Sequence, residues 1–417
     1  MRKLSFIEKV FSLVNVFPNK KQLTVFGISW RWNKKHPFAA FPIQRNKVVF
    51  WAYSNSFTCN PKYIALKLIE LTDKCDVVWV SDRKIEYDKK LEGKIRFVHG
   101  IEDSVKELST AMVIVSNERM NYWMYRKFLK REGQYVINTW HGSLGIKRTG
   151  QDRDDLTKEE IDILKIDSKA VDYITSNSDY SDNLYKRIFF NNGELIKTGL
   201  PRNDVFFREK DNKVHNYYSV PNEVKFALYA PTWRESVSKD CININPDIVV
   251  EALEKKFGGK WIFLIRNHHF SKHDEIRDDG IIDVTLYQDI QEIMMESDVL
   301  ITDYSSCIYD FILSGKPGFI YATDRKEYEE SRGLYYSLDE TPFPVSENMS
   351  GLLKSILDFN EEEYKHKVES FLKGKGCRED GHASERIALL INDLISNKVK
   401  DISLYGKASR FPVLEIE

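Results

Sequence analysis

The 417-residue sequence lacks the features that mark several common classes of protein. Its five cysteines are an odd number and form no Cys-x-x-Cys pair, which argues against a disulfide framework or a zinc site. No apolar run is long enough to span a bilayer. The glycine patterns GxGxxG and GxxxxGK[ST] are also absent, so dinucleotide and P-loop binding lack their key feature. The composition therefore favours a globular protein of the reducing cytoplasm.

Positive and negative charges nearly balance over the whole chain, but the first 50 residues are strongly basic. The net charge is −1, which gives no global attraction to nucleic acid. Residues 1–50, however, carry ten Lys or Arg and only one acidic residue, Glu8. Such a basic block is typical of a segment that meets an anionic surface, either a membrane or a nucleic acid. No recognised nucleic-acid-binding motif accompanies it, so we expect no nucleic-acid partner.

The first residues predict a short amphipathic helix over 1–18. Apolar residues recur at helical spacing on one face: Leu4, Ile7, Val10, Phe11 and Val14. Glu8 and Lys9 interrupt the apolar stretch, which argues against a signal peptide. Two interpretations remain open, because this face could bind a membrane or dock on the protein's own core. The basic flanks favour the membrane.

Short apolar runs alternate with helical patterns in two successive series. Predicted strands of the first series are 22–28, 47–53, 77–81, 96–99, 112–116, 135–139 and 173–176, with helices at 61–71 and 103–108. Strands of the second series are 226–229, 261–265, 299–302 and 319–321, with helices at 247–256 and 290–297. Such alternation predicts an α/β protein with two Rossmann-like domains.

We expect the chain to divide at a charged stretch without periodicity, 208–224, which has the composition of a linker. The segment 1–18 would associate with the membrane, 19–207 would form the first domain and 225–417 the second. The tail, 361–396, predicts two helices joined by a glycine-rich turn near 374–381.

Four polar segments directly follow predicted strands, where open parallel sheets bind ligands. The first, Asn138-Thr139-Trp140-His141-Gly142-Ser143, offers an imidazole that can act as a base near neutral pH, beside a glycine that permits close approach. The alternative is a histidine that only caps a strand end. In the second segment, Thr232 and Arg234 follow a strand, and Arg suits bidentate phosphate binding. Its alternative is a loop with a surface arginine.

The remaining two segments lie in the second series. Arg266 and His268-His269 follow a very apolar strand and suit an anion; a metal site would need further ligands, and we expect none. Asp303 precedes Ser305 and Ser306, which open a predicted helix, and hydroxyls with free N–H groups at a helix start favour phosphate. A solvated strand end and a plain helix cap are the respective alternatives. Together the four segments predict a cleft for a phosphate-bearing ligand.

These segments, in this order, resemble the CDP-glycerol glycerophosphotransferase family, the teichoic acid primases and polymerases. The resemblance covers about residues 47–387 and rests on the following stretches: NKVVFWAYSNSFTCNPKYI, NTWHGS, TSNSDY, KTGLPRND, YAPTWRE, LIRNHH, SDVLITDYSSCIYDF, GKPGFIYATDRKEYEESRGLYY and EDGHASERI. It implies a GT-B-like fold whose two domains face a cleft, and attack by an acceptor hydroxyl on the β-phosphorus of a CDP-polyol.

The resemblance also implies roles for particular residues. His141 matches the histidine of the family's WHG motif, the candidate base, and His268 matches a second histidine that would steady the pyrophosphate. Donor-binding positions match at Arg234, Thr232, Arg266, Asp303, Ser305 and Ser306, and further matches are Gly142, Ser143, Arg202 and His269. WHGS departs from the common WHGT but keeps the hydroxyl, and His269 leaves open which histidine of the pair acts.

We therefore expect an enzyme that transfers a polyol phosphate from CDP-glycerol or CDP-ribitol to an undecaprenyl-type lipid-linked acceptor, in teichoic acid or capsule synthesis. It would lie peripherally on the cytoplasmic face of the cell membrane and require no cofactor, with the need for a divalent cation open. The alternatives are a GT-B glycosyltransferase that uses a nucleotide-sugar and a non-catalytic membrane scaffold of a polymer assembly complex.

Overall fold

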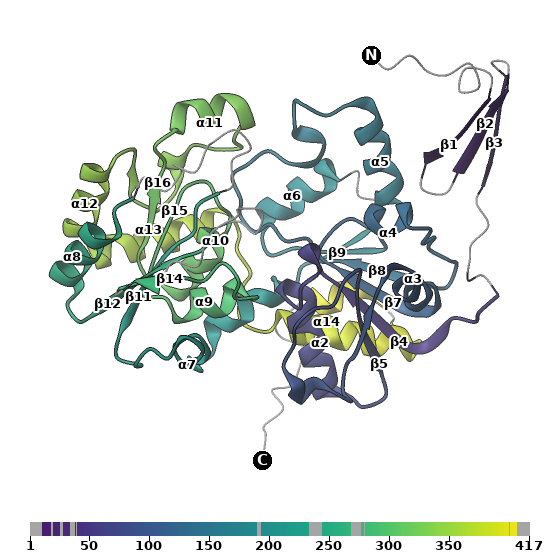
Figure 1. Ribbon diagram of the computed structural model, residues 1–417, viewed down its shortest axis with the longest axis horizontal. Coiled ribbons are helices and arrows are strands. Elements are labelled where there is room, and N and C mark those ends of the chain that lie inside the picture. The colour runs from purple at the N-terminus through teal and green to yellow at the C-terminus, as the bar shows by residue number, and fades with distance from the viewer. Residues whose placement is uncertain are drawn as a thin grey trace.

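A computed structural model describes most of the chain after residue 37. The described residues are 11–17, 20–25, 28–33, 38, 40–189, 193–232, 244–267, 277–278, 280–399 and 401–406. No helix among them is long and apolar enough to cross a bilayer. Two α/β units lie side by side, and a small antiparallel sheet lies beside the first (Figure 1).

The amphipathic helix predicted over 1–18 is wrong for the residues that the structure describes. Three antiparallel strands occupy this region: β1 (Phe11–Phe17), β2 (Lys20–Val25) and β3 (Ile28–Asn33). The run FSLVNVF is aromatic and β-branched, and it pairs with β2, which in turn pairs with β3. A short apolar run fits both the helical and the strand period, and here the pairing with β2 stabilises the strand. Residues 1–10 lie outside the described part.

The first unit is a seven-stranded sheet in the order β10-β9-β8-β7-β4-β5-β6, with every pair parallel. The strands are β4 (Gln44–Trp51), β5 (Asp76–Ser81), β6 (Arg96–His99), β7 (Ala111–Ser116), β8 (Tyr135–Asn138), β9 (Tyr173–Thr175) and β10 (Glu194–Ile196). Alternate β4 side chains join two cores on opposite faces, one with helices α2 (Cys59–Leu71) and α14 (Ala383–Ile395), the other with α3 (Ile101–Thr110). Burial on both faces explains the continuous apolar run of β4.

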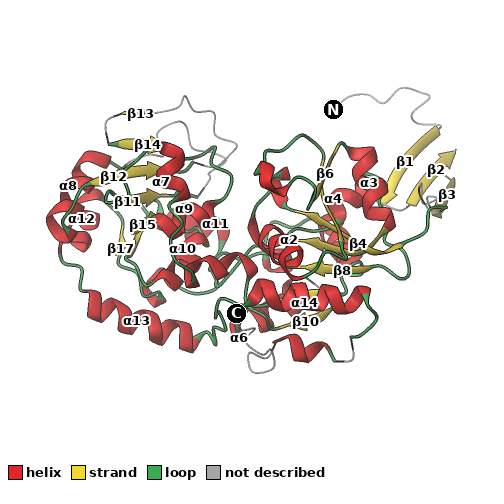
Figure 2. Ribbon diagram, turned by 90° about the horizontal axis from the view of Figure 1, so that it is seen from below, coloured by secondary structure: helices red, strands yellow, loops and turns green. Residues whose placement is uncertain are grey.

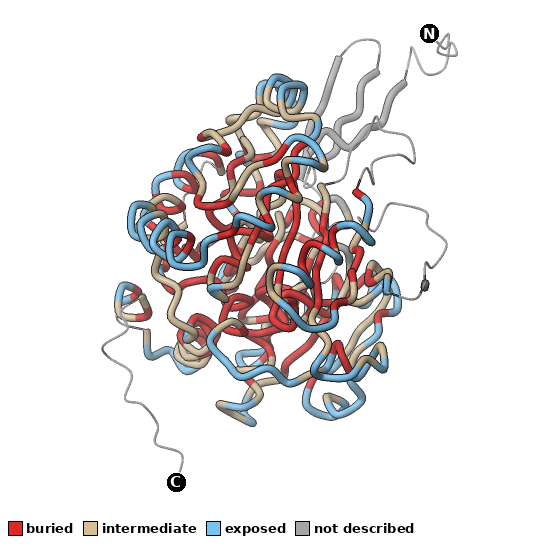
Figure 3. Tube along the Cα trace, turned by 90° about the vertical axis from the view of Figure 1, so that its left-hand side faces the viewer, coloured by how far each residue is buried: buried red, intermediate tan, exposed pale blue. Residues whose placement is uncertain are grey.

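The second unit is another seven-stranded sheet, in the order β13-β14-β12-β11-β15-β16-β17. Its strands are β11 (Lys225–Tyr229), β12 (Trp261–Ile265), β13 (Arg277–Asp278), β14 (Ile281–Asp283), β15 (Val299–Thr302), β16 (Gly318–Tyr321) and β17 (Val345–Ser346). Only β13 is antiparallel among these described strands. Figure 3 shows that the buried residues lie mainly in the interior of the molecule and the exposed ones on its periphery.

The stretch 208–224, which the sequence marks as a linker, contains a helix that belongs to the second core. This helix is α7 (Lys213–Tyr218), and Val214 and His215 on it are buried. Nδ1 of His215 lies 2.6 Å from Oε2 of Glu296, whose carboxylate also accepts the backbone N–H groups of Val214 and His215. The charged composition of the stretch concealed these buried contacts.

The chain passes between the two units more than once. Leu144 and Ile146, just after β8, belong to the core of the second unit. The predicted pair of C-terminal helices is present, but its members separate: α13 (Glu361–Gly374) packs on the second unit and α14 on the first (Figure 2). The C-terminal helices therefore do not all belong with residues 225–380, because the apolar face of α14 completes the first core.

Candidate active site

A cleft of about 1700 Å³ lies between the two units, at the carboxyl ends of their strands. Seven of the residues predicted from the sequence line it: His141, Arg202, Thr232, Arg266, Asp303, Ser305 and Ser306. Gly142 and Ser143 are not among its lining residues. The predicted residues Arg234, His268 and His269 lie outside the described part of the chain. Chemistry-bearing groups from the four predicted segments, and Arg202 from a fifth, thus meet in one place.

His141 lies on the loop after β8 and is held in one tautomer. Its Nδ1 lies 2.7 Å from the backbone carbonyl oxygen of Asn117, which can only accept, so Nδ1 carries the proton. Burial lowers the pKa of His141 to about 4, and the positive charges of Arg202 and Arg119 act in the same direction. The ring is therefore neutral near pH 7, and Nε2 is available to accept a proton.

Interior residues on both sides of His141 hold the loop that follows β8. A Cβ atom on Gly142 would lie 2.9 Å from Nε1 of Trp140, so only glycine fits without a shift. The hydroxyl of Tyr185 donates to the carbonyl oxygen of Gly142 at 2.7 Å. Ser143 is buried, and its hydroxyl accepts from Nδ2 of Asn177 at 3.0 Å. Gly142 and Ser143 thus support the loop from the interior.

Arg266 supplies positive charge from the second unit. Its Nη1 donates to the carbonyl oxygens of Val284 at 2.9 Å and Tyr287 at 2.6 Å, which fixes the loop after β14. Burial lowers the pKa of Arg266, although the charge of Asp289 acts in the opposite direction. A cleft-lining guanidinium in these surroundings favours an anionic ligand.

Asp303 joins two loops of the second unit. Its Oδ1 accepts the backbone N–H of Thr232 at 2.8 Å and that of Tyr304 at 2.6 Å. These bonds hold the loop after β11 against the loop after β15. The carboxylate thereby holds Thr232 at the cleft, which gives Asp303 a structural role beside Ser305 and Ser306.

Ser305 and Ser306 precede α10 (Cys307–Phe311), as the sequence predicts. Ser305 Oγ accepts weakly from the N–H of Cys307, at 3.4 Å. A Cβ atom on Gly145 would lie 3.4 Å from Cβ of Ser306, so the loop after His141 closely approaches this turn. His141 and the serine pair therefore belong to neighbouring loops of opposite units.

Arg202 forms a buried ion pair across the two units. It lies on the 3₁₀ helix Pro201–Phe207 of the first unit, and its Nη2 lies 2.7 Å from Oδ2 of Asp310 on α10. Burial disfavours the charge of Arg202, but Asp310, Cys59 and Tyr53 together outweigh it and raise the pKa of Arg202. Asp310 and Asn117 were not predicted as site residues. Asn117 directly follows strand β7, which is the one signal in the sequence that could have pointed to it.

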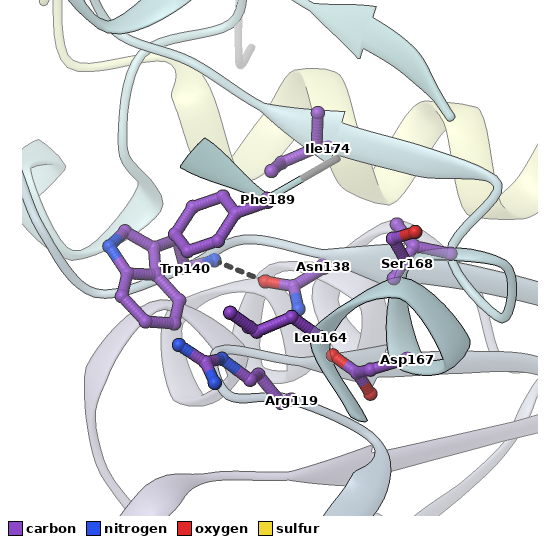
Figure 4. Close-up of a pocket in the computed structure, with 9 residues that line it drawn as sticks. Arg119, Asn138, Trp140, Leu164, Asp167, Ser168, Ile174 and Phe189 are labelled. Carbon is purple, nitrogen blue, oxygen red and sulfur yellow. Dashed lines mark hydrogen bonds between the residues drawn. The ribbon is translucent and has the colours of Figure 1, made fainter. Parts of the chain in front are cut away.

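A second, much smaller cavity lies behind Trp140, as Figure 4 shows. It encloses about 20 Å³, room for roughly one water molecule. Arg119 and the buried carboxyl of Asp167 line it, and burial raises the pKa of Asp167 to about 7. Its size excludes it as the substrate site. The described residues contain no cluster of His, Cys, Asp and Glu suited to a metal ion.

Two α/β units with mainly parallel sheets, around a cleft that holds a neutral histidine, arginines and serines, define a two-domain α/β protein whose cleft suits an anionic ligand. Residues 35–393 match the family described as CDP-Glycerol:Poly(glycerophosphate) glycerophosphotransferase, and the chain belongs to this family of enzymes. It is thus a transferase of the kind that acts in teichoic acid synthesis, as its named relatives indicate.

Two named relatives show the range of the family. The chain is 31% identical to the teichoic acid glycerol-phosphate transferase of Staphylococcus aureus (strain NCTC 8325 / PS 47), over 66% of this chain and 74% of that protein. It is 26% identical to the teichoic acid poly(glycerol phosphate) polymerase of Bacillus subtilis (strain 168), over 93% of this chain. The match spans only about half, 52%, of the Bacillus subtilis polymerase.

The fold is similar to solved structures of the wall teichoic acid polymerase TagF. One of them, a histidine-to-asparagine variant soaked with CDPG, is 26% identical, with a TM-score of 0.73 over 86% of this chain and 91% of that chain. A histidine-to-alanine variant gives the same TM-score at 25% identity, with the same coverage of both chains.

Proposed function

We propose that this protein transfers glycerol phosphate from CDP-glycerol to a hydroxyl of a lipid-linked acceptor and releases CMP. One observation carries the proposal: a histidine held neutral, with one nitrogen unprotonated, lines the same cleft as Arg266 and the serine pair. A neutral imidazole accepts a proton, and the groups opposite it suit a diphosphate. Family membership supplies the substrate class.

The reaction is a displacement at phosphorus. The acceptor hydroxyl gives its proton to Nε2 of His141 while its oxygen forms a bond to the β-phosphorus of the donor. The bond between that phosphorus and the bridging oxygen breaks, and CMP leaves with the electron pair. Arg266 and the hydroxyls of Ser305 and Ser306 offset the charge on the phosphoryl oxygens. A positioned base contributes about two to four orders of magnitude in rate.

We propose that the two units, in a GT-B-type arrangement, divide the substrates. The second unit would hold the donor, because Thr232, Arg266, Ser305 and Ser306 all follow its strands. Arg234 and His268, which belong to matching motifs, are proposed to join them at the pyrophosphate. The first unit would hold the acceptor and present His141. Neither a metal nor another cofactor enters this proposal.

The acceptor is proposed to be an undecaprenyl-type lipid, met at the cytoplasmic face of the cell membrane. Support comes from the basic composition of residues 1–50, with ten Lys or Arg against one acidic residue, which favours an anionic lipid surface. This proposal no longer depends on an amphipathic helix, since Phe11–Phe17 is a strand.

A donor screen tests the proposed function. The purified protein is incubated with a synthetic lipid-linked acceptor and, in turn, CDP-glycerol, CDP-ribitol and UDP-sugars. We expect CMP release and an acceptor mass increase of one glycerol phosphate with CDP-glycerol. CDP-ribitol is the comparison within the polyol class. Release of UDP with transfer of a sugar would contradict the proposal and indicate a glycosyltransferase, and no transfer from any donor would favour a scaffold.

A further inference from the structure

The residue before His141 has an unusual backbone conformation. Trp140 has φ = +51°, in the left-handed region that bulky side chains rarely adopt. Its N–H donates to Oδ1 of Asn138 at 2.7 Å, and its ring centroid lies 4.1 Å from that of His141. A turn of this kind persists only where surrounding groups hold it, and it sets the direction in which the next residue leaves the strand.

The side chain of Asn60 forms a hydrogen bond to the backbone of Trp140. It lies on α2, in the first unit, and is completely buried. Its Nδ2 donates to the carbonyl oxygen of Trp140 at 2.9 Å and, at a longer 3.5 Å, to that of Thr139. Its Oδ1 accepts the backbone N–H of Arg202 at 3.0 Å. The Asn60 amide thus connects the loop that carries His141 to the segment that carries Arg202.

The partners of Asn60 determine the orientation of its amide. The carbonyl oxygens of Trp140 and Thr139 can only accept, and the N–H of Arg202 can only donate. If the amide were rotated by half a turn, its oxygen would face the carbonyl oxygen of Trp140 and its NH₂ group would face the N–H of Arg202. A carboxylate in the same position would satisfy Arg202 but would face two carbonyl oxygens without a proton to offer.

Asn60 itself does not line the cleft, so its effect on chemistry acts through neighbours. The loop that it holds carries His141, whose Nδ1 must reach the carbonyl oxygen of Asn117 to leave Nε2 free. Beyond His141, Tyr185 fixes the carbonyl oxygen of Gly142. Asn60 before the histidine and Tyr185 after it thus hold the loop on both sides, and the hydroxyl of Thr139 also donates to the carbonyl oxygen of Trp140, at 3.2 Å.

We propose that Asn60 is a positioning residue that holds Trp140 in the left-handed conformation and thereby aims His141 at the acceptor hydroxyl. This inference rests on the proposed function for the identity of the reaction. It predicts that loss of the Asn60 amide lowers turnover without loss of donor binding. A misplacement of a catalytic group by about 1 Å costs on the order of 100-fold in rate.

The test compares Asn60→Asp, which keeps the acceptor for Arg202, with Asn60→Ser, which removes both contacts without adding charge. CMP release from CDP-glycerol gives kcat, and calorimetry with CDP-glycerol gives donor affinity. We expect both variants to lose about 100-fold in kcat while donor affinity changes little. Asn360→Asp is the matched control, because Asn360 only caps α13 through Oδ1 and aspartate caps equally well.

A second readout needs no turnover. The ring of His141 is titrated by NMR and identified by the signal that His141→Gln removes. Burial, with Arg202 and Arg119 as the nearby charges, lowers the pKa of the wild-type ring to about 4. Released from its loop, the ring should titrate closer to the ordinary value of about 6.5. The added carboxylate of Asn60→Asp should raise the pKa further.

The outcomes separate this inference from the proposed function. Wild-type kcat and an unshifted His141 titration in folded Asn60 variants overturn the positioning role, as does a loss confined to donor binding. A wild-type protein that releases no CMP contradicts the proposed function instead, while the titration still decides the role of Asn60. If Asn60→Asp does not fold, Asn60→Ser carries both measurements.

Discussion

Nδ1 of His141 lies 2.7 Å from the backbone carbonyl oxygen of Asn117, and this contact determines which ring nitrogen is free for chemistry. Because a carbonyl oxygen only accepts, the proton stays on Nδ1 and Nε2 is the basic atom. Asn117 also fixes the neighbouring loop, since its Oδ1 accepts the N–H of Tyr53 at 3.0 Å. Since the backbone supplies the contact, no side-chain replacement removes the acceptor itself.

Replacement of His141 tests its role as the base. We expect His141→Gln to lower kcat by at least about 100-fold, since a positioned base contributes about two to four orders of magnitude. CMP release from CDP-glycerol measures the rate, and thermal unfolding checks that the variant is folded. A folded variant with near wild-type turnover would exclude His141 as the base.

The pH dependence of the rate follows from the lowered pKa of His141, about 4. A lowered pKa keeps the ring neutral at every pH above it, so protonation of His141 should cause no loss of kcat/KM between about pH 5.5 and 7.5. A rate profile with CDP-glycerol measures this. An acid limb near pH 6.5 that His141→Gln abolishes would be the opposite result.

The lowered pKa of His141 also makes the free energy of unfolding depend on pH. The unfolded histidine has a pKa of about 6.5 and takes up a proton before the folded one does. The contribution of His141 is therefore complete above about pH 6.5 and is lost as the pH falls towards 4. Urea unfolding of the wild type and His141→Gln at several pH values should show a steeper loss in the wild type over this range.

The buried ion pair between Arg202 and Asp310 predicts a large effect on stability. Asp310→Asn leaves the guanidinium buried without its counter-charge, and we expect the free energy of unfolding to fall by about 3–5 kcal/mol. Urea unfolding measures it. Glu361→Gln, which breaks the exposed pair between Lys365 and Glu361, is the control and should change stability by less than about 1 kcal/mol. Equal effects of the two variants would count against the buried pair.

The crossing of α14 into the first unit predicts a distant effect of a C-terminal substitution. Ile391 is completely buried against the first core, and Ile391→Ala should cost about 2–5 kcal/mol. Hydrogen exchange should become faster in β4 and α2 of the first unit. Leu357→Ala, at a partly exposed position on α12 (Met349–Leu357), is the control. Faster exchange confined to the second unit would contradict the packing.

The sequence predicts the strands well because their chemistry is local. Strands β6, β12 and β15 begin and end at the predicted residues, since apolar runs there are bounded by polar ones. The short strands β10, β13, β14 and β17 have no such pattern and are missing from the prediction. The pattern of α14 shows an apolar face but cannot say which core that face completes, and Phe11–Phe17 fits a helix or a strand until its partners are known.

The site residues likewise include some that local sequence patterns predict and others that depend on long-range contacts. Segments after strands identified His141, Arg266 and the serine pair, because parallel strands bring their carboxyl ends to one edge. Asn60 and Asp310 were missed because their roles depend on contacts between residues more than 75 positions apart in the chain, such as the bond from Asn60 to Trp140 across 80 positions. No spacing in the sequence reveals such contacts.

Calorimetry with CDP-glycerol tests the division of the cleft most directly. If the donor lies on the second unit and the base on the first, the Ser305→Ala/Ser306→Ala double variant should bind the donor more weakly. Each lost charge-assisted hydrogen bond costs about 1.5–3 kcal/mol. His141→Gln should bind it about as well as the wild type. If His141→Gln alone abolished binding while the serine variant bound normally, the assignment of the two units would be contradicted.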